Sequence, residues 1–134
     1  MSIVVDTGIV VAFLDADDAH HARAAEWIAT VDDDLVTTPL AIAEMDHLAD
    51  EIGAAKTLRG DLARGVYTVR WWADAMDETL AVSRRRPDVG LTDASLVALA
   101  NRLRTDRIAT LDLHHFRTLK TRNGKPFTIL PADA

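Results

Sequence analysis

Short apolar runs and longer segments with helical spacing alternate along this chain. The short runs have the length and the β-branched composition of buried strands, whereas the longer segments place apolar residues three and four positions apart. The predicted strands cover residues 3–6, 35–38, 66–70, 107–111 and 127–130. The predicted helices cover residues 8–14, 20–31, 39–52, 54–63, 73–85, 92–104 and 114–119. This order predicts an α/β layer fold with a mostly parallel central sheet of four to five strands, because right-handed crossovers place helices on both faces of such a sheet.

Four carboxylates stand where this pattern would place apolar residues. Asp6 and Asp112 each follow a predicted strand, and ligands of parallel sheets gather beyond the carboxyl ends of the strands. Glu44 and Asp93 lie on predicted helices beside apolar neighbours. Because an unpaired carboxylate in apolar surroundings costs several kcal/mol, converging acids indicate a divalent cation that neutralises them. The sequence therefore predicts one metal site that contains these four residues.

Helix capping is the alternative explanation for three of the acids. Asp6, Asp93 and Asp112 precede or open predicted helices, where a carboxylate can accept hydrogen bonds from free backbone amides. Glu44 lies in the middle of its predicted helix, where capping does not account for it. A single metal site explains all four acids with one cause, whereas capping needs three separate caps and an independent buried glutamate.

Hydroxyl and imidazole groups lie next to two of these acids. Thr7 and Thr110 are expected to hold a carboxylate or a water by hydrogen bonding, although threonine at a strand end is more often structural. His114 and His115 follow Asp112, but a metal-activated hydroxide needs no histidine, so neither is given a catalytic role.

Length and composition limit the class of protein. The 134 residues, 49% of them hydrophobic, are expected to form a single domain over residues 1–134. The absence of cysteine excludes disulfides, thiolate catalysis and cysteine-based zinc sites. No apolar stretch approaches the roughly 18 residues of a membrane span, and no signal peptide precedes the first strand. We expect a protein of the cytoplasm without a membrane partner.

The net charge of −6 is unevenly distributed along the chain. Residues 1–53 carry a net charge of −11 and residues 54–134 carry +5. Such asymmetry can mark a surface that binds polyanions, although a solvated surface explains it equally well. If a polyanion approaches the acids, cationic side chains are expected around the rim. The candidates are Arg84, Arg85, Arg86, Arg102, Arg104, Arg107, Arg117, Lys120, Arg122 and Lys125.

The acidic motifs resemble those of a known family, the PIN-domain ribonucleases, and especially the VapC-type toxins of toxin–antitoxin modules. The resemblance covers nearly the whole chain and includes four segments in the family's order. These segments are Ile3-Val4-Val5-Asp6-Thr7-Gly8, Pro39-Leu40-Ala41-Ile42-Ala43-Glu44, Leu91-Thr92-Asp93-Ala94-Ser95-Leu96, and Thr110-Leu111-Asp112 with Phe116. Each segment alone is weak, but none of the four acids is replaced.

This resemblance implies a three-layer α/β/α PIN-like domain that cleaves RNA endonucleolytically with Mg²⁺ or Mn²⁺. Asp6 and Asp93 are expected to be the most direct metal ligands. Glu44 and Asp112 are expected to act through water, to complete a second ion site or to orient the attacking water. Transfer RNA and ribosomal RNA loops are both plausible substrates by resemblance. The partners it implies are a cognate antitoxin and a second copy of the chain in a homodimer.

Two other functions remain open from the sequence. A receiver-like phosphoacceptor domain would also place Asp6 after a strand, but it needs an acidic pair there and gives Glu44 no role. A non-catalytic scaffold that binds RNA or protein would share the fold without turnover, and the four intact acids argue against it.

Overall fold

The computed structural model describes residues 1–134 and contains a five-stranded sheet in which every strand pair is parallel. The strands are β1 (Ser2–Val5), β2 (Asp34–Thr37), β3 (Thr68–Val69), β4 (Arg107–Ala109) and β5 (Thr128–Leu130). Their order in the sheet is β3-β2-β1-β4-β5, so β1 lies at the centre. The predicted mostly parallel sheet is confirmed.

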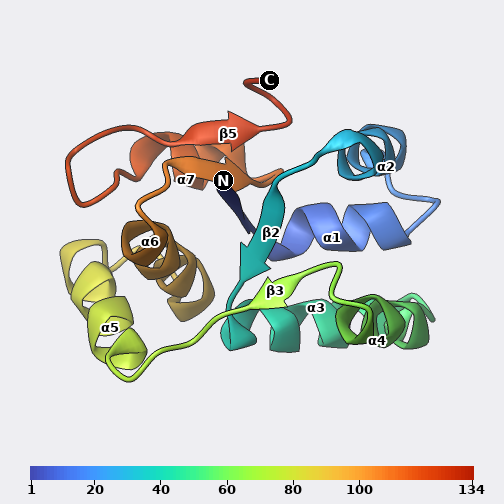
Figure 1. Cartoon of the computed structure of the whole chain (residues 1–134), viewed down its shortest axis with the longest axis horizontal. Coiled ribbons are helices and arrows are strands. Elements are labelled where there is room, and N and C mark those ends of the chain that lie inside the picture. The colour runs from blue at the N-terminus through green and yellow to red at the C-terminus, as the bar shows by residue number, and fades with distance from the viewer.

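Seven helices cover the two faces of this sheet. They are α1 (Thr7–Leu14), α2 (His21–Thr30), α3 (Pro39–Glu51), α4 (Ala55–Ala63), α5 (Ala75–Arg85), α6 (Leu91–Leu103) and α7 (Leu113–Thr118). The chain first adds β2 and then β3 on one side of β1. It then crosses back over β1 and forms β4 and β5 on the other side. Right-handed crossovers therefore place α1 to α4 on one face and α5 to α7 on the other (Figure 1). The result is the expected three-layer α/β/α fold.

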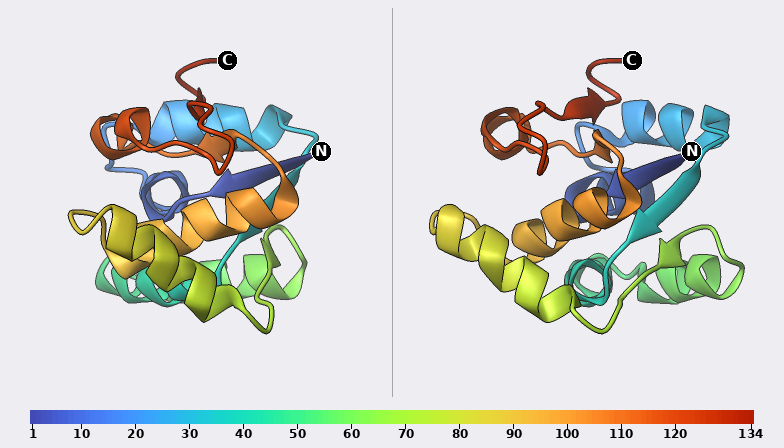
Figure 2. Two further views of the ribbon diagram at one scale, coloured as in Figure 1. Left: turned by 90° about the vertical axis from the view of Figure 1, so that its left-hand side faces the viewer. Right: turned by 60° about the vertical axis from the view of Figure 1, so that its left-hand side comes forward.

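Helix α6 is the central helix of its layer. Every residue from Ala94 to Ala100 is buried, and α6 packs between α5 and β1 (Figure 2). A helix that is apolar around its circumference is one that neighbours enclose on all sides. Because its middle is fixed in the core, one end of α6 is held near the carboxyl ends of the strands and the other near their amino ends.

Helix α3 begins and ends where the sequence predicts. The Thr38 hydroxyl accepts a hydrogen bond from the Ala41 amide at 3.3 Å, and Pro39 occupies the first helical position. Gly53, with φ 73°, follows the last turn in the left-handed conformation that glycine adopts readily. A hydrogen bond of 2.8 Å between the Thr38 and Ser95 hydroxyls ties the start of α3 to α6. The beginnings of these two helices are thus positioned together.

The main departure from the predicted elements is β3. The pattern over residues 66–70 predicts a strand, but only Thr68 and Val69 pair with β2, and both are exposed. This strand lies at the edge of the sheet, where one side of the backbone has no partner. No helix of the structure combines the length and the apolar character that a membrane span requires.

Candidate metal and nuclease site

A pocket of about 620 Å³ opens beyond the carboxyl ends of β1 and β4, and we call it the acid pocket. All four predicted acids line it. Its lining consists of Asp6, Thr7, Gly8, Glu44, Gly90, Leu91, Thr92, Asp93, Leu111 and Asp112. These residues come from segments far apart in the chain, and the parallel arrangement of the strands explains their convergence. The predicted convergence of the four acids is present in the structure.

Asp6 is the most buried of the four, with 7% of the residue exposed. One carboxylate oxygen accepts a hydrogen bond from the Thr7 amide at 2.7 Å, and the other accepts one from the Thr110 hydroxyl at 2.7 Å. Burial, followed by repulsion from Asp93, raises the Asp6 pKa to about 6, even though the two hydrogen bonds favour the charged form. Asp6 therefore caps α1 and also holds a charge that a cation would stabilise.

Asp93 lies in the first turn of α6, where free amides and the helix dipole favour a negative charge. Its side chain is 20% exposed. Burial and then the nearby Asp112 raise the pKa of Asp93 above the usual aspartate value, while His115 opposes this effect. Asp6 and Asp93 repel each other electrostatically, as expected for carboxylates that share one cation site.

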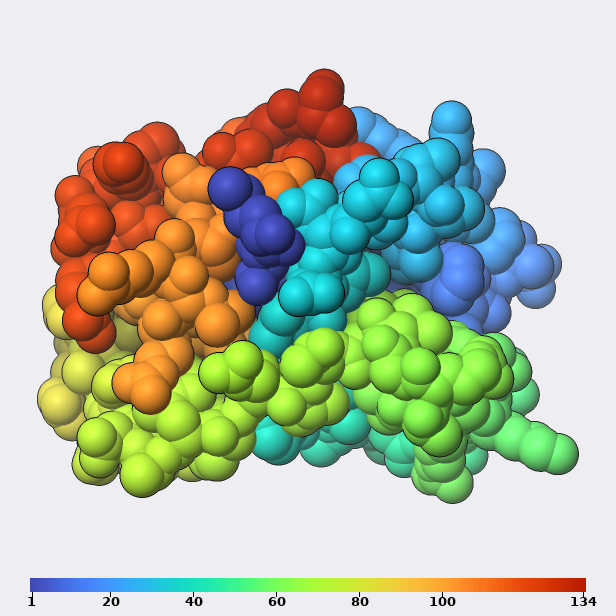
Figure 3. Space-filling model, in the orientation of Figure 1, coloured from blue at the N-terminus to red at the C-terminus, as the bar shows by residue number.

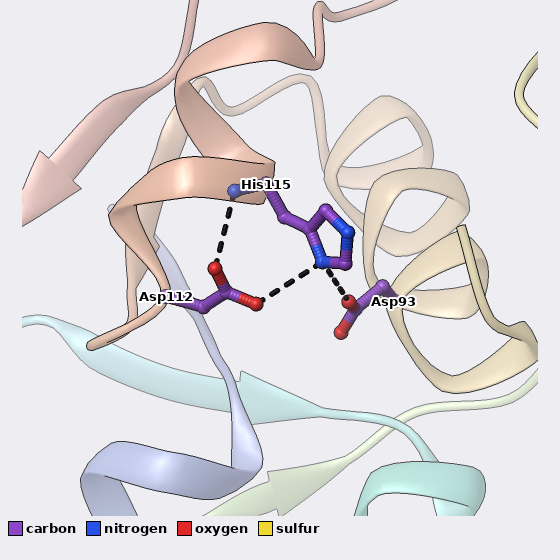
Figure 4. A group of neighbouring side chains, drawn as sticks. All are labelled: Asp93, Asp112 and His115. Atoms are coloured by element: carbon purple, nitrogen blue, oxygen red, sulfur yellow. Dashed lines mark hydrogen bonds and ion pairs between the residues drawn. The ribbon is translucent and has the colours of Figure 1, made fainter. Parts of the chain in front are cut away.

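Asp112 and His115 lie together at the start of α7, next to Asp93 of α6 (Figure 4). The Asp112 carboxylate accepts a hydrogen bond from the His115 amide at 3.1 Å and so caps α7. The His115 Nδ1 atom lies 3.1 Å from Asp112 Oδ2 and 3.5 Å from Asp93 Oδ2. Asp93, Asp112 and His115 each offer a ligand atom, and these atoms all lie within 4.8 Å of one another.

His115 lies close to the acids, a position that the sequence did not lead us to expect. Sequence reasoning gave it no catalytic role, yet its imidazole lies between two carboxylates of the acid pocket. Its spacing of three residues from Asp112, at the start of a helix, places both side chains on one side of the first turn. That spacing was visible in the sequence, whereas the approach of Asp93 from α6 was not.

Glu44 lines the acid pocket and is exposed, so it lies beside the inward face of α3 rather than on it. The buried stripe of α3 runs through Ala41, Met45 and Ala49, which leaves Glu44 one position before the stripe, at its edge. Its negative charge nevertheless contributes to the raised pKa of both Asp6 and Asp93. Glu44 therefore belongs to the pocket wall rather than to the core.

The two threonines next to the acids differ in their contacts. The Thr110 hydroxyl donates to Asp6 and accepts from the Asp112 amide at 2.9 Å, so it links two of the acids. The Thr7 hydroxyl is buried without any hydrogen-bond partner, although Thr7 lines the acid pocket. A buried polar atom without a partner is uncommon. Carboxylate oxygens and a free hydroxyl fit a hydrated divalent cation of the Mg²⁺ or Mn²⁺ type.

The cationic rim expected around the acids has no member among the residues that line the acid pocket. No arginine or lysine lines the pocket, whereas Leu91, which is 48% exposed, does, and Leu113, which is 42% exposed, directly follows Asp112 in the chain. Carboxylates hold several of the candidate arginines elsewhere: Arg86 pairs with Asp88, Arg107 with Asp33 and Arg117 with Asp133. Three other candidates, Arg104, Arg122 and Lys125, line a cleft at the amino ends of the strands, away from the acids. Sequence spacing could not reveal these three-dimensional pairings.

Comparisons with known proteins agree with this geometry. The model of the PIN domain family matches residues 3–120. The ribonuclease VapC26 of Mycobacterium tuberculosis is 33% identical over 135 residues, which cover 96% of this chain and 100% of that protein. The resemblance to PIN-domain ribonucleases is therefore confirmed by sequence comparison.

Solved structures show the same fold at lower identity. The crystal structure of Mycobacterium tuberculosis VapC20, described as a sarcin-ricin loop cleaving toxin, aligns with a TM-score of 0.69 and 20% identity over 79% of this chain and 86% of that chain. A toxin–antitoxin complex from Klebsiella pneumoniae aligns with a TM-score of 0.65 and 18% identity over 87% of this chain and 92% of that chain. Fold and sequence comparison lead to the same conclusion: this chain belongs to the PIN-domain family.

Proposed function

We propose that this chain is a metal-dependent endoribonuclease and the toxin of a toxin–antitoxin pair. The observation that carries this proposal is the convergence of Asp6, Glu44, Asp93 and Asp112 on one pocket, where burial raises the pKa of Asp6 to about 6. Perturbed acids in a pocket are typical of functional sites. The family match and the ribonuclease relative point to RNA phosphodiester bonds as the substrate.

Mg²⁺ or Mn²⁺ is the cofactor that we propose for the acid pocket. Asp6 and Asp93 are its direct ligands, and Glu44 and Asp112 bind it through water, complete a second ion site or orient the attacking water. When bound, a divalent cation supplies a water of lowered pKa and neutralises charge that develops on the phosphate. Thr110 fixes the carboxylate of Asp6 by its hydrogen bond. The free Thr7 hydroxyl is available to a metal-bound water.

The apolar side chains beside the pocket favour a protein partner. Leu91 lines the pocket and is exposed, and Leu113, which directly follows Asp112, is exposed as well; a segment of a cognate antitoxin could bury both while it covers the pocket. The Klebsiella pneumoniae neighbour is a toxin–antitoxin complex, which supports this part of the proposal. We also propose a homodimer, for which the exposed Met76 and Leu80 of α5 offer apolar surface. A cytoplasmic location, where RNA and antitoxin are present, completes the proposal.

The RNA target is proposed only at the level of class. Loops of transfer RNA or ribosomal RNA remain the candidates, and the related VapC20 is described as cleaving the sarcin-ricin loop. Mapping of cleaved ends across a transcriptome would identify the sequence that this chain cuts.

The experiment that tests the proposed function compares RNA cleavage by the parent with that by Glu44→Gln and Asp93→Asn. Purified protein is incubated with cellular RNA and Mn²⁺, and cleavage rates are measured by gel. We expect each variant to lose at least about 100-fold in rate, because each removes a charge that positions the metal or the water. The matched controls are Glu51→Gln on the same helix α3 and Asp77→Asn in the first turn of α5, which should cleave like the parent.

Two outcomes would contradict this function. Cleavage by Glu44→Gln and Asp93→Asn at the parent rate would remove the acid pocket as the active site. Binding of RNA by the parent without cleavage in either metal would favour the non-catalytic scaffold. A receiver-like domain has no support from the family match, and labelling of Asp6 by a small phosphodonor would be needed to revive it.

A further inference from the structure

A second cleft, of about 660 Å³, lies at the amino ends of β1 and β4, whereas the acid pocket lies at their carboxyl ends. We call it the amino-end cleft. Its walls come from the start of β1, the end of α6 and the loop between α7 and β5. Figure 3 shows this face, with the N-terminal residues in dark blue at the centre, next to the orange segment that ends α6 and begins β4. The polar side chains that line it include Asn101, Arg104, Asp106, Thr121, Arg122 and Lys125.

The amino-end cleft contains cations that have no carboxylate partner. None of Arg104, Arg122 and Lys125 lies within 4.0 Å of an acidic oxygen, whereas Arg59, Arg64, Arg86, Arg107 and Arg117 are each paired. Asp106 is the single acid among the lining residues. The end of α6 adds roughly half a negative charge, which three cations exceed even after Asp106 is counted. The cleft is therefore positive within a protein whose net charge is −6.

Arg104 holds its place in the cleft at a conformational cost. It follows α6 with φ 55° and is the only residue other than glycine with positive φ. Glycine is the usual residue at this position after a helix, because a side chain disfavours the left-handed conformation. A residue kept in a disfavoured conformation suggests a functional reason for its side chain. In this cleft the feature that glycine could not supply is the guanidinium group.

We propose that the amino-end cleft binds phosphate groups of the RNA substrate, as a contact separate from the acid pocket. Guanidinium groups bind phosphate through paired hydrogen bonds, and an ammonium group adds a point charge. No arginine or lysine lines the acid pocket, so cationic side chains that bind further phosphates of a polyanion have to lie on another surface. RNA as the ligand rests on the proposed nuclease function.

The geometry of α6 sets the distance between the two contacts. Asp93 lies in the first turn of α6 and Arg104 directly after its last turn. At about 1.5 Å per residue, their backbones are roughly 16 Å apart along the helix axis. One nucleotide cannot span this distance, so a folded RNA or a longer segment can use both contacts and a dinucleotide cannot. The amino-end cleft should therefore favour large RNA over short fragments.

A binding experiment with two cleft variants tests this inference. The variants are Arg122→Gln/Lys125→Gln and, separately, Arg104→Gly, and the probe is fluorescein-labelled unfractionated transfer RNA in EDTA, which prevents metal-dependent cleavage. The control is Arg23→Gln/Lys56→Gln, which removes two exposed, unpaired charges from α2 and α4 on the other face of the sheet. Affinity is measured by anisotropy over a range of salt concentrations.

We expect the double cleft variant to bind transfer RNA about tenfold more weakly than the parent, with a salt slope reduced by about 1.4 to 1.8, as for the loss of two phosphate contacts. Arg104→Gly should also bind more weakly while its melting temperature stays equal or rises, which excludes unfolding as the cause. The control should bind like the parent. Cleavage of a labelled RNA dinucleotide with Mn²⁺ should be unchanged in all variants, because the dinucleotide cannot reach the cleft.

Equal binding of transfer RNA by the cleft variants and the control variant would overturn the inference. A parent that binds transfer RNA through the cleft but never cleaves RNA would contradict the nuclease function and leave the phosphate contact standing. A dinucleotide cleavage rate that falls in the cleft variants would also overturn the inference, because the cleft would then act on the acid pocket rather than on distant phosphates.

Discussion

The two ends of helix α6 carry opposite chemistry. At its first turn Asp93 contributes to a pocket of four acids that no arginine or lysine lines, and beyond its last turn Arg104 belongs to a cleft with three unpaired cations. Both charges agree with the helix dipole, which favours an anion at the amino end and a cation at the carboxyl end. The buried middle of the helix fixes the separation. One rigid element thus places a proposed metal site and a proposed phosphate site at a set distance.

The charge asymmetry of the sequence has a different form in three dimensions. The first part of the chain is strongly acidic and the rest is basic, but the acid pocket takes Asp6 and Glu44 from the first part and Asp93 and Asp112 from the second. Ion pairs remove Arg86, Arg107 and Arg117 from any general basic surface. What distinguishes the two ends of α6 is therefore the set of charges left unpaired there.

The largest effect that we predict concerns Asp6 and pH. The Asp6 pKa is about 6 in the folded protein and close to the ordinary aspartate value of 3.8 in the unfolded chain. The folded state therefore binds this proton more tightly. Without metal, the stabilisation that follows from the raised pKa of Asp6 is fully present below about pH 4 and is lost as pH rises through about 6. The free energy of unfolding should fall by about 3 kcal/mol in total over this range. Urea unfolding at several pH values in EDTA measures it.

The Asp6→Asn variant isolates this contribution. Because asparagine carries no charge, the metal-free variant should be more stable than the parent above pH 6, and the difference should shrink toward pH 4. Subtracting the two profiles cancels the carboxyls that do not interact with Asp6, including Asp88 and Asp133, whose pKa values their arginine partners lower to about 2. Parallel profiles for parent and variant would show that the acid pocket does not strain the ionised Asp6.

A smaller effect is expected from His115, which lies between Asp93 and Asp112. Either as a ligand or as a hydrogen-bond partner of the two acids, its imidazole should strengthen metal binding. We expect His115→Ala to weaken Mn²⁺ binding by about tenfold in calorimetric titration, and to weaken Mg²⁺ binding less, because imidazole suits Mg²⁺ poorly.

His114→Ala is the matched control for this titration, since His114 is exposed and forms no contact with the acids. Unchanged Mn²⁺ affinity in His115→Ala would show that the imidazole only fills space between the carboxylates.

The smallest effect sharpens the contrast at the other end of α6. Arg104→Gly should raise the unfolding free energy by about 0.5–1 kcal/mol, because glycine accepts the left-handed conformation without a steric penalty. Thermal unfolding at high salt, where charge effects are screened, measures this gain. A loss of stability would mean that the arginine side chain is kept for packing.

The fold was predictable because local patterns and topology agreed. The apolar runs and helical spacings located every strand and helix, and the parallel sheet brought Asp6 and Asp112 to one edge, as the strand ends required. The capping alternative is also fulfilled for Asp6 and Asp112, which bond the amides of Thr7 and His115. Capping and membership of the acid pocket are therefore compatible in this fold.

The features that the sequence could not predict depend on contacts between elements. The apolar neighbours of Glu44 placed it on or beside the inward face of its helix, and only the packing of α3 shows that the buried stripe lies one position away from it. The role of His115 depends on the approach of Asp93 from another helix. The places of Arg104 and Arg122 depend on a cleft whose walls come from three separate segments.

The most direct test of the central claim is the anomalous difference map of a crystal of the parent protein grown with Mn²⁺. We predict a peak in the acid pocket, about 2.0–2.2 Å from a carboxylate oxygen of Asp6 and one of Asp93, and no peak in the amino-end cleft. A map with no peak among the acids at saturating Mn²⁺, or with those carboxylates too far apart to share an ion, would contradict the account.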